Sequence, residues 1–442
     1  MRILFIYSGV AKYNESKNRP SFVDRLSSVL TDFSENLVFP TLAAVTPEKH
    51  SIELIDARYQ KINFYEDYDL VGITVTTPTA PSAYLIADEF RRRGVKVVLG
   101  GCHPSAMALE AKEHADSVVI GDAEETWPQL LIDFENHDLK PFYEQKTPSD
   151  LSKTIAARRE ILGMDGLDKI LLDARLEVTR GCSNRCKFCA ITNICYGGVF
   201  RTRPIDKLLD EIRNIPQKMI RFASPSMTVD LGYTKQLFKE MKGLGKRFVC
   251  DGNIDVLGRD DELLKLANEA GCISWFVGFD SITQKSLDSV DKKSNKAKDY
   301  VKSVKKVHDY GMMIDGSFIF GFDQDMPDVF DSTINFIDDL EIDRLIFYIL
   351  TPYPGTPLFT QFENEGRILT KDWSRYTNEE VVFRPKNMSP EELYEGTQMV
   401  KKYYASLTNS IKRSLTSINL YGFLPSMKDF ARASILFMRY SK

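Results

Sequence analysis

The chain has 442 residues, with 58 Lys and Arg against 62 Asp and Glu, so its formal net charge is −4 at neutral pH. Hydrophobic residues make up 43% and charged residues 27%, a balance that excludes a disordered or fibrous chain and leaves no basic surface for a nucleic-acid partner. No run approaches the roughly 20 consecutive apolar residues that cross a bilayer, so the sequence predicts a soluble protein of two or three domains.

The first 142 residues predict a Rossmann-like α/β domain. Short apolar runs alternate there with helix-length polar segments, which is typical of a doubly wound parallel sheet. The expected strands are residues 2–7, 51–55, 70–75, 95–99 and 117–120. Such sheets bind ligands beyond the carboxyl ends of their strands. The expected ligand-binding loops are therefore residues 8–14, 76–81, 100–105 and 121–126.

The rest of the chain predicts a linker, a second α/β domain and a helical tail. Residues 143–172 are polar and have no clear period, so we interpret them as an interdomain linker. Between residues 173 and 389, six strand-like runs alternate with helical segments, which indicates a full or partial β/α (TIM) barrel with its chemistry at the carboxyl ends of the strands. Residues 390–442 should be helical, and the charged run 292–308 should form one solvated helix face.

The cysteines supply the strongest chemical signal. Cys182, Cys186 and Cys189 form a C-x3-C-x2-C motif directly after the first predicted barrel strand. Thiolates are soft ligands that suit iron–sulfur clusters and zinc. A cubane 4Fe–4S cluster normally takes four cysteines, so three would leave one iron open to another ligand.

Other uses of the cysteines remain open. The triplet could instead hold zinc, with Cys195 or a distant His as the fourth ligand. We expect Cys195 to be a free thiol near the cluster, and Cys102, Cys250 and Cys272 to be small core residues. Seven cysteines, an odd number, favour a reducing cytoplasm over a disulfide framework, and the N-terminal apolar run is too short for a secretion signal.

The cysteine motif after a barrel strand resembles the radical S-adenosylmethionine (SAM) superfamily. This resemblance implies that SAM binds the open iron and is cleaved to a 5′-deoxyadenosyl radical after one-electron reduction, with flavodoxin or ferredoxin as an electron donor. It also implies contacts to SAM from an aromatic residue between the cysteines and from polar residues at strand ends. Ser224 stands where many relatives carry a pair of acids. The implied SAM-binding residues are Phe188, Arg203, Ser224, Asp251, Asn253, Asp280, Ser281 and Tyr348.

Two loops of the first domain predict its ligand. The sequences Gly100-Gly101-Cys-His103-Pro and Gly-Asp-Ala-Glu124-Glu125 each follow a strand, and glycines allow a bulky ligand to approach the backbone. No G-x-G-x-x-G follows a strand and no P-loop lysine is present, which disfavours a dinucleotide. A large flat ligand fits better.

Together with the barrel, these loops resemble the cobalamin-binding domain of cobalamin-dependent radical SAM enzymes. The resemblance implies that the corrinoid contacts Thr76, Thr77, Gly100, Gly101, His103, Glu124 and Glu125. The first loop contains no D-x-H-x-x-G, so the resemblance implies a cobalamin bound without a histidine ligand from that loop.

Four later stretches resemble the subgroup of hopanoid methylases and bacteriochlorophyll-pathway enzymes. These stretches are residues 320–325, 350–357, 372–376 and 382–388. The resemblance implies methylation of an unactivated carbon on a hydrophobic isoprenoid, lipid or tetrapyrrole, with one SAM methylating cobalamin and a second supplying the radical. The alternatives are a radical cyclisation, oxidation or carbon–carbon coupling without methyl transfer, and a corrinoid or metal carrier without catalysis. No catalytic or substrate-binding residue is assigned.

The C-terminal region adds a possible partner. Residues 410–442 carry six basic and one acidic side chain, and their apolar residues recur at helical spacing. A basic amphipathic helix can lie on an anionic membrane, where a lipid substrate would be found, although packing against the barrel explains the same pattern.

Overall fold

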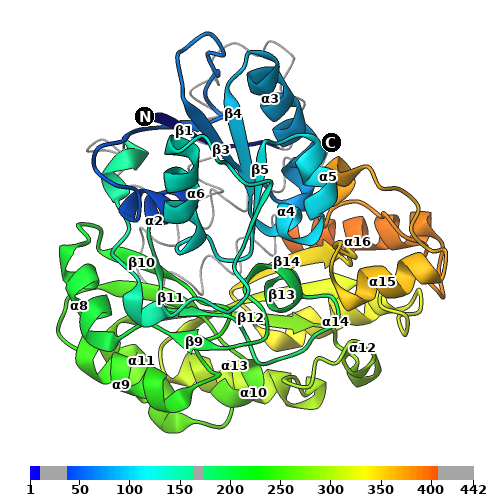
Figure 1. Cartoon of the computed structure of the whole chain (residues 1–442). Helices are drawn as coiled ribbons and strands as arrows, with labels where there is room; N and C mark the ends of the chain where they lie inside the picture. The colour runs from blue at the N-terminus through cyan, green and yellow to red at the C-terminus, as the bar shows by residue number, and fades with distance from the viewer. Residues whose placement is uncertain (10–36, 164–172, 407–442) are drawn as a thin grey trace.

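The computed structural model describes residues 1–9, 37–163 and 173–406. Two α/β domains lie against each other (Figure 1), the N-terminal one drawn in blue to cyan and the second in green to orange. Each is built on one six-stranded parallel sheet. The α/β architecture predicted for both domains is therefore present.

The N-terminal sheet has the strand order β2-β1-β3-β4-β5-β6. Its central strands are apolar along their whole length because helices cover both faces, which is why alternation is absent from them. The strands are β1 (Arg2–Tyr7), β2 (Ser51–Asp56), β3 (Leu70–Thr74), β4 (Lys96–Gly100), β5 (Ser117–Ile120) and β6 (Phe142–Glu144). The helices are α2 (Val38–Ala44), α3 (Ala80–Arg92), α4 (Cys102–Ala106), α5 (Ala108–Glu113) and α6 (Thr126–Glu135).

The domain boundary differs slightly from the expected one. Strand β6 pairs with β5, so the sheet extends into the segment expected as a linker from residue 143. The linker itself contains two short 3-10 turns, η2 (Leu151–Lys153) and η3 (Arg159–Leu162). A strand of only three residues within a polar stretch carries too little pattern to be recognised from sequence.

The second sheet has the order β14-β13-β12-β11-β10-β7, so β7 and β14 form its two edges and the barrel is partial. Large apolar side chains on one face of each strand pack against the surrounding helices. The strands are β7 (Ala174–Glu177), β10 (Met219–Ala223), β11 (Arg247–Asp251), β12 (Cys272–Asp280), β13 (Met313–Phe320) and β14 (Arg344–Ile349). Its helices are α8 (Ile205–Asn214), α9 (Leu231–Met241), α10 (Ile254–Leu257), α11 (Asp261–Ala270), α12 (Gln284–Ser289), α13 (Tyr300–Asp309) and α14 (Val329–Leu340).

Two small elements follow β7 and frame the cysteine motif. Strands β8 (Thr179–Arg180) and β9 (Arg201–Thr202) form an antiparallel pair on either side of it. Between them lies a short π-helical segment, η4 (Ile191–Cys195). Gly181 has φ of +78°, and a Cβ there would lie 2.0 Å from the carbonyl oxygen of Val199, so only glycine can begin this loop.

The segment after β14 returns to the N-terminal domain. Helix α15 (Pro357–Asn364) and the 3-10 turn η6 (Trp373–Arg375) place Trp373 and Tyr376 in the core of that domain beside α3. Helix α16 (Pro390–Ala405) then packs on α14 and begins with a capping box between Ser389 and Glu392. The start of the predicted helical region is thus present. The basic amphipathic part at 410–442 lies outside the described residues.

None of the helices in the described part of the chain combines the length and the apolar character that a membrane crossing requires.

Candidate functional site

The cysteine triplet lies at the carboxyl end of β7, immediately after β8. Cys182 and Cys186 are 8% and 6% exposed, Cys189 is half-buried, and all three thiols are free. Within the described ranges, no three His, Cys, Asp or Glu side chains have the geometry of a single-ion site. In a cubane cluster each cysteine would bind a different iron, so three free thiols on one short loop suit such a cluster.

Burial controls the chemistry of these thiols. Burial raises the pKa of Cys186 to about 12 and also raises the pKa of Cys182, while the Lys292 ammonium opposes both shifts. Without metal, the thiols of Cys182 and Cys186 therefore hold their protons at neutral pH. Metal binding must release these protons, because the thiolate is the ligand.

Lys292 is a residue that the sequence interpretation placed wrongly. It was expected on a solvated helix face, yet its side chain is 14% exposed and its Nζ lies 2.6 Å from Oδ2 of Asp280. Burial alone would lower the pKa of Lys292, but Asp280 and the thiol of Cys186 outweigh it and the pKa is raised. A permanent cation thus stands beside the cysteines. The loop that carries it returns from α12 to the end of β12, which sequence spacing alone did not reveal.

Several predicted SAM contacts meet near this position. Asp280 ends β12 with φ of +63° and is buried together with Ser281, whose hydroxyl accepts a hydrogen bond from the backbone amide of Thr283, the N-cap residue of α12. The Phe188 ring makes an edge contact with Phe322, with ring centroids 6.0 Å apart. Asp280, Ser281 and Phe188 are therefore grouped around the cysteine loop.

The strand ends on the other side of the sheet carry a second group. Ser224 follows β10, is buried and accepts a hydrogen bond from the Thr179 amide at 3.3 Å. Asp251 ends β11, and burial raises its pKa to about 7 although nearby arginines oppose the shift. Asn253 is the N-cap residue of α10, and its backbone N–H donates a hydrogen bond to the Thr228 hydroxyl at 2.9 Å. A carboxyl with this pKa changes charge near neutral pH.

Two further predicted SAM contacts are Arg203, which lies apart from these groups, and Tyr348, which is on the edge strand of the sheet. Arg203 is buried against Glu211 at 2.7 Å and lines a different cavity, of about 520 Å³, between α8 and residues 153–160. Tyr348 lies on β14, next to Ile319 of β13 in the sheet. The structure therefore does not bring Arg203 to the cysteine loop.

A cavity of about 400 Å³ lies between the two domains. Apolar residues of the N-terminal sheet, α2 and α6 form one end, and residues of β7, β8 and η4 form the other. Thr76, Gly100, Gly101 and Glu124 line it, as expected for ligand-binding residues. Gly101, with φ of +106°, is required by the fold itself, because a Cβ would lie 2.8 Å from the carbonyl oxygen of Val75.

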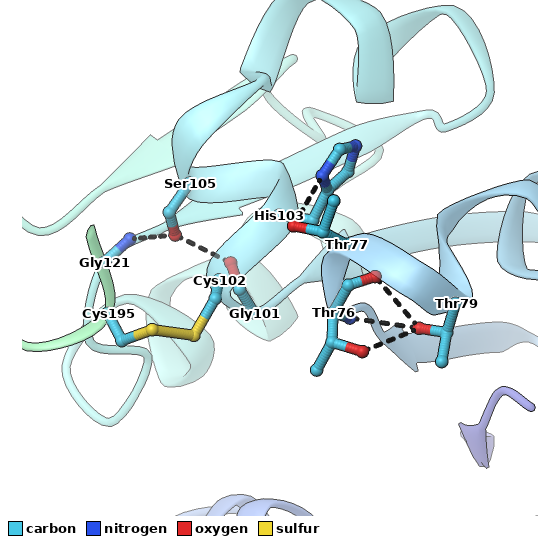
Figure 2. The surroundings of a disulfide bond; sticks show 9 residues. All are labelled: Thr76, Thr77, Thr79, Gly101, Cys102, His103, Ser105, Gly121 and Cys195. Atoms are coloured by element: carbon cyan, nitrogen blue, oxygen red, sulfur yellow. Dashed lines mark hydrogen bonds between the residues drawn. A yellow bond between two sulfur atoms is a disulfide. The ribbon is translucent and has the colours of Figure 1, made fainter. Parts of the chain in front are cut away.

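The remaining predicted corrinoid contacts do not line this cavity. The His103 ring is buried behind it, with Nδ1 3.3 Å from the Thr77 hydroxyl (Figure 2) and Nε2 3.2 Å from Glu110. The Trp373 indole also donates a hydrogen bond to Glu110. His103 therefore belongs to a buried hydrogen-bond network between the domains. The Glu125 carboxylate accepts a hydrogen bond from the Gln145 side chain, and this contact is exposed to solvent.

A disulfide crosses the cavity wall and corrects two predictions. Cys102, expected in the core, and Cys195, expected as a free thiol, are bonded, with their Cα atoms 4.9 Å apart (Figure 2). Both line the cavity, and the bond joins α4 of the N-terminal domain to η4 of the second. Cys195 is therefore not available as the fourth ligand of a zinc site. Cys250 and Cys272 are buried and free, as predicted.

Thiol counting checks the disulfide. Metal-free protein unfolded without reductant should show five reactive thiols, and seven after reduction. The Cys195→Ser variant, in contrast, should show six in both states. Closing a loop of 93 residues should stabilise the fold by about 4 to 5 kcal/mol, which denaturation with and without reductant measures. Seven thiols in the unreduced wild type would contradict the bond.

Ion pairs join the two domains next to the cysteine loop. Arg180 lies 3.1 Å from Asp122, 2.6 Å from Glu124 and 2.6 Å from Glu177, and its side chain is 6% exposed. Arg201 binds the same Asp122 at 2.7 Å. Sequence reasoning missed Arg180 because two of its three partners, Asp122 and Glu124, lie more than fifty residues away in the β5–α6 loop.

Comparisons with known proteins agree with this arrangement. Residues 176–337 match the radical SAM superfamily, and residues 42–131 match the B12 binding domain. The chain is 33% identical to the bacteriochlorophyllide d C-8(2)-methyltransferase of Chlorobaculum tepidum, over 80% of this chain and 82% of that protein. It is 32% identical to the C-12(1)-methyltransferase of the same organism, over 75% and 74% of the two chains.

A solved structure shares the whole fold. The radical SAM methyltransferase TsrM from Kitasatospora setae, with cobalamin and a 4Fe–4S cluster bound, has a TM-score of 0.66 and 16% identity. The alignment covers 100% of this chain and 99% of that one. The domain matches and the relatives confirm the family, the fold and the three cofactors predicted from the sequence. The chain belongs to the cobalamin-dependent radical SAM methyltransferases, enzymes that use SAM, a 4Fe–4S cluster and cobalamin.

Proposed function

We propose that the protein methylates a saturated carbon at the edge of a tetrapyrrole, with Cys182, Cys186 and Cys189 holding the cluster. The observation that carries this proposal is the cavity between the domains, which is lined by the N-terminal strand ends and by the segments on either side of the cysteine loop. The two relatives above act on bacteriochlorophyllide d, according to their names. A tetrapyrrole is therefore the substrate class that we assign.

The residues of this chain fit the expected cofactors. When bound, SAM and the cluster supply a 5′-deoxyadenosyl radical and the corrinoid supplies the methyl group. Phe5, Gly72 and Trp127 belong to the apolar end of the cavity against the N-terminal sheet, which suits an apolar part of the corrinoid. Thr76, Gly100, Gly101 and Glu124 line the same cavity. Of the corrinoid contacts predicted from the sequence, these four are the ones that we still propose.

The charged, aromatic and polar residues around the cysteines are proposed to have different roles. Lys292, fixed by Asp280, presents a cation that can bind a carboxylate beside the thiols. Phe188 and Phe322 close the apolar side of the loop and exclude water from it. Ser281, Ser224, Asp251 and Asn253 remain candidates for contacts to SAM. A flavodoxin or ferredoxin is the proposed source of the electron.

Product analysis tests the proposed reaction. Protein loaded anaerobically with iron, sulfide and hydroxocobalamin should convert bacteriochlorophyllide d, SAM and a reductant to a methylated chlorin. Each methylation should yield one S-adenosylhomocysteine and one 5′-deoxyadenosine, because one SAM supplies the methyl group and a second the radical. Mass spectrometry of the chlorin and chromatography of the nucleosides measure both.

Cobalamin-free protein is the control and should form no methylated product. Formation of 5′-deoxyadenosine and methionine without S-adenosylhomocysteine would overturn the methyl transfer and favour a cyclisation, oxidation or coupling. Methylation of a hopanoid and not of the chlorin would overturn the tetrapyrrole assignment.

A further inference from the structure

The inner face of the second sheet carries charged side chains that the reaction does not account for. Leu176 of β7 and Ile220 and Phe222 of β10 pack in the core between the sheet and its helices. Because side chains alternate along a strand, Arg175 and Arg221 lie on the opposite face, inside the partial barrel. Both residues are half-buried.

The two arginines are direct neighbours. Arg221 is in register with Arg175 in the parallel pairing of β10 and β7, so their Cα atoms are about 5 Å apart. A third inner-face arginine, Arg344, is bound to Asp315 at 2.6 Å. In the described part of the chain, by contrast, the guanidinium groups of Arg175 and Arg221 have no hydrogen-bond or ion-pair partner.

One acid faces this pair without neutralising it. Asp251 feels the charges of both arginines, yet it forms no ion pair with either among the described residues. Burial raises the pKa of Asp251 to about 7, so that it carries only part of a charge near neutral pH. Glu177, the next inner-face residue of β7, is paired with Arg180, so only Asp251 opposes these two permanent cations and an excess of positive charge remains. Such a pair of guanidinium groups can bind one carboxylate through several hydrogen bonds.

We propose that Arg175 and Arg221 bind a carboxylate of the substrate, the propionate side chain of a tetrapyrrole acid. This inference rests on the proposed function and names the polar group by which its substrate is held. Arg175 also lines the cavity between the domains, together with Glu177 and Ala223, so a ligand in that cavity can reach Arg175, beside which Arg221 lies.

The carboxylate of SAM is a less suitable occupant. A cluster held by the cysteine triplet would place that carboxylate next to the cysteine loop, where Lys292 and Asp280 form an ion pair. The arginine pair lies one inner-face position before the end of β7, and Lys292 already supplies a cation at the cysteines. Arg175 and Arg221 therefore remain for the substrate.

Binding of a chlorin acid and of its ester tests this assignment without turnover. Pyropheophorbide a has one carboxylate, a propionate, and its methyl ester masks that group. We would titrate both into the cluster- and cobalamin-loaded protein and follow the fluorescence anisotropy of the chlorin. Wild type should bind the acid about 10- to 100-fold more tightly than the ester, because hydrogen bonds between charged groups are strong. Arg175→Gln, Arg221→Gln and the double variant should bind the acid as weakly as the ester.

The matched control is Arg247→Gln, an exposed arginine at the start of β11. It should keep the preference for the acid, and every variant should keep the iron and cobalamin content and the SAM affinity of wild type. Equal binding of acid and ester by wild type would overturn the arginine assignment while leaving a tetrapyrrole substrate in place. Loss of SAM affinity in the arginine variants, with the acid preference retained, would also overturn it. Failure of wild type to bind either chlorin would overturn both the assignment and the proposed substrate class.

Discussion

Replacing Cys186 by alanine should abolish cleavage of SAM. The variant would present two thiols in place of three, and a cubane cluster with two protein ligands is not retained. Iron and sulfide assays after anaerobic reconstitution should fall from about four of each per chain to background, and 5′-deoxyadenosine should become undetectable. We choose Cys186 for this substitution because it is the most buried of the three cysteines.

Two controls separate loss of the cluster from loss of the fold. Cys250→Ala removes a buried thiol from the core of the same domain and should keep full iron content and activity. Cobalamin binding by Cys186→Ala should stay near one per chain, because the proposed corrinoid contacts lie in the N-terminal domain, which matches the B12 binding domain. A variant that retained four irons or still formed 5′-deoxyadenosine would refute the assignment of Cys186. Unchanged activity after replacement of all three cysteines would favour a carrier without radical chemistry.

The fold was predictable from the sequence where a strand can be recognised from the pattern of apolar residues within its own segment. Both faces of β1, β3 and β4 are buried, so each strand is a continuous apolar run that stands out between polar segments. In the second domain β13 is buried on both faces in the same way, whereas β7, β10 and β14 alternate buried and half-buried residues and were recognised by that alternation. Strand β6 escaped prediction because it has three residues and pairs only at the sheet edge.

The site was predictable where its residues are contiguous. The cysteine triplet and the Gly100-Gly101 turn are short motifs whose spacing carries the information, and both lie at strand ends as expected. His103 illustrates the limit. Its position after a strand matched a ligand-binding loop, yet its ring is held by Thr77 and Glu110 behind the cavity.

Residues that act through distant partners could not be found from sequence. The bond between Cys102 and Cys195 joins segments 93 residues apart. The Arg175 and Arg221 pair is visible only once the register of β7 and β10 is known. Lys292 stands in a lysine-rich run, and its burial depends on the return of its loop to the end of β12. Tertiary proximity, which one sequence does not encode locally, decides each case.

Replacing Arg180 by methionine should weaken the contact between the domains more than any other single change outside the cysteine loop. Methionine keeps the apolar stem but removes the cation, which leaves the carboxylates of Asp122, Glu124 and Glu177 together in a buried site. Removing one partner of a buried ion pair costs about 3 to 5 kcal/mol. Urea denaturation at neutral pH should show a loss of that size, with a matching loss of bound cobalamin.

The pH dependence of this loss identifies its cause. In the wild type, burial alone would raise the pKa of Asp122, but Arg180, Ser149 and Arg201 together outweigh burial and the pKa is lowered. The stability that Asp122 contributes is therefore present above its unfolded pKa and is lost as the pH falls through the folded one. In the variant, the unpaired carboxylates should have raised pKa values and take up protons at mildly acidic pH. The difference in unfolding free energy between wild type and Arg180→Met should thus become smaller as the pH falls from about 8 to about 5.

A second substitution distinguishes charge from packing. Arg180→Lys keeps the cation but cannot form the forked contacts of a guanidinium, so its deficit should be smaller than that of methionine. Arg201→Met, which removes the other cation at Asp122, should also cost less, because Arg180 still neutralises the site. If Arg180→Met lost the same stability at every pH, lost packing would be its cause. If it lost none, the buried ion pairs would not hold the cysteine loop against the N-terminal domain, and the 2.6 Å contacts to Glu124 and Glu177 would have no energetic role.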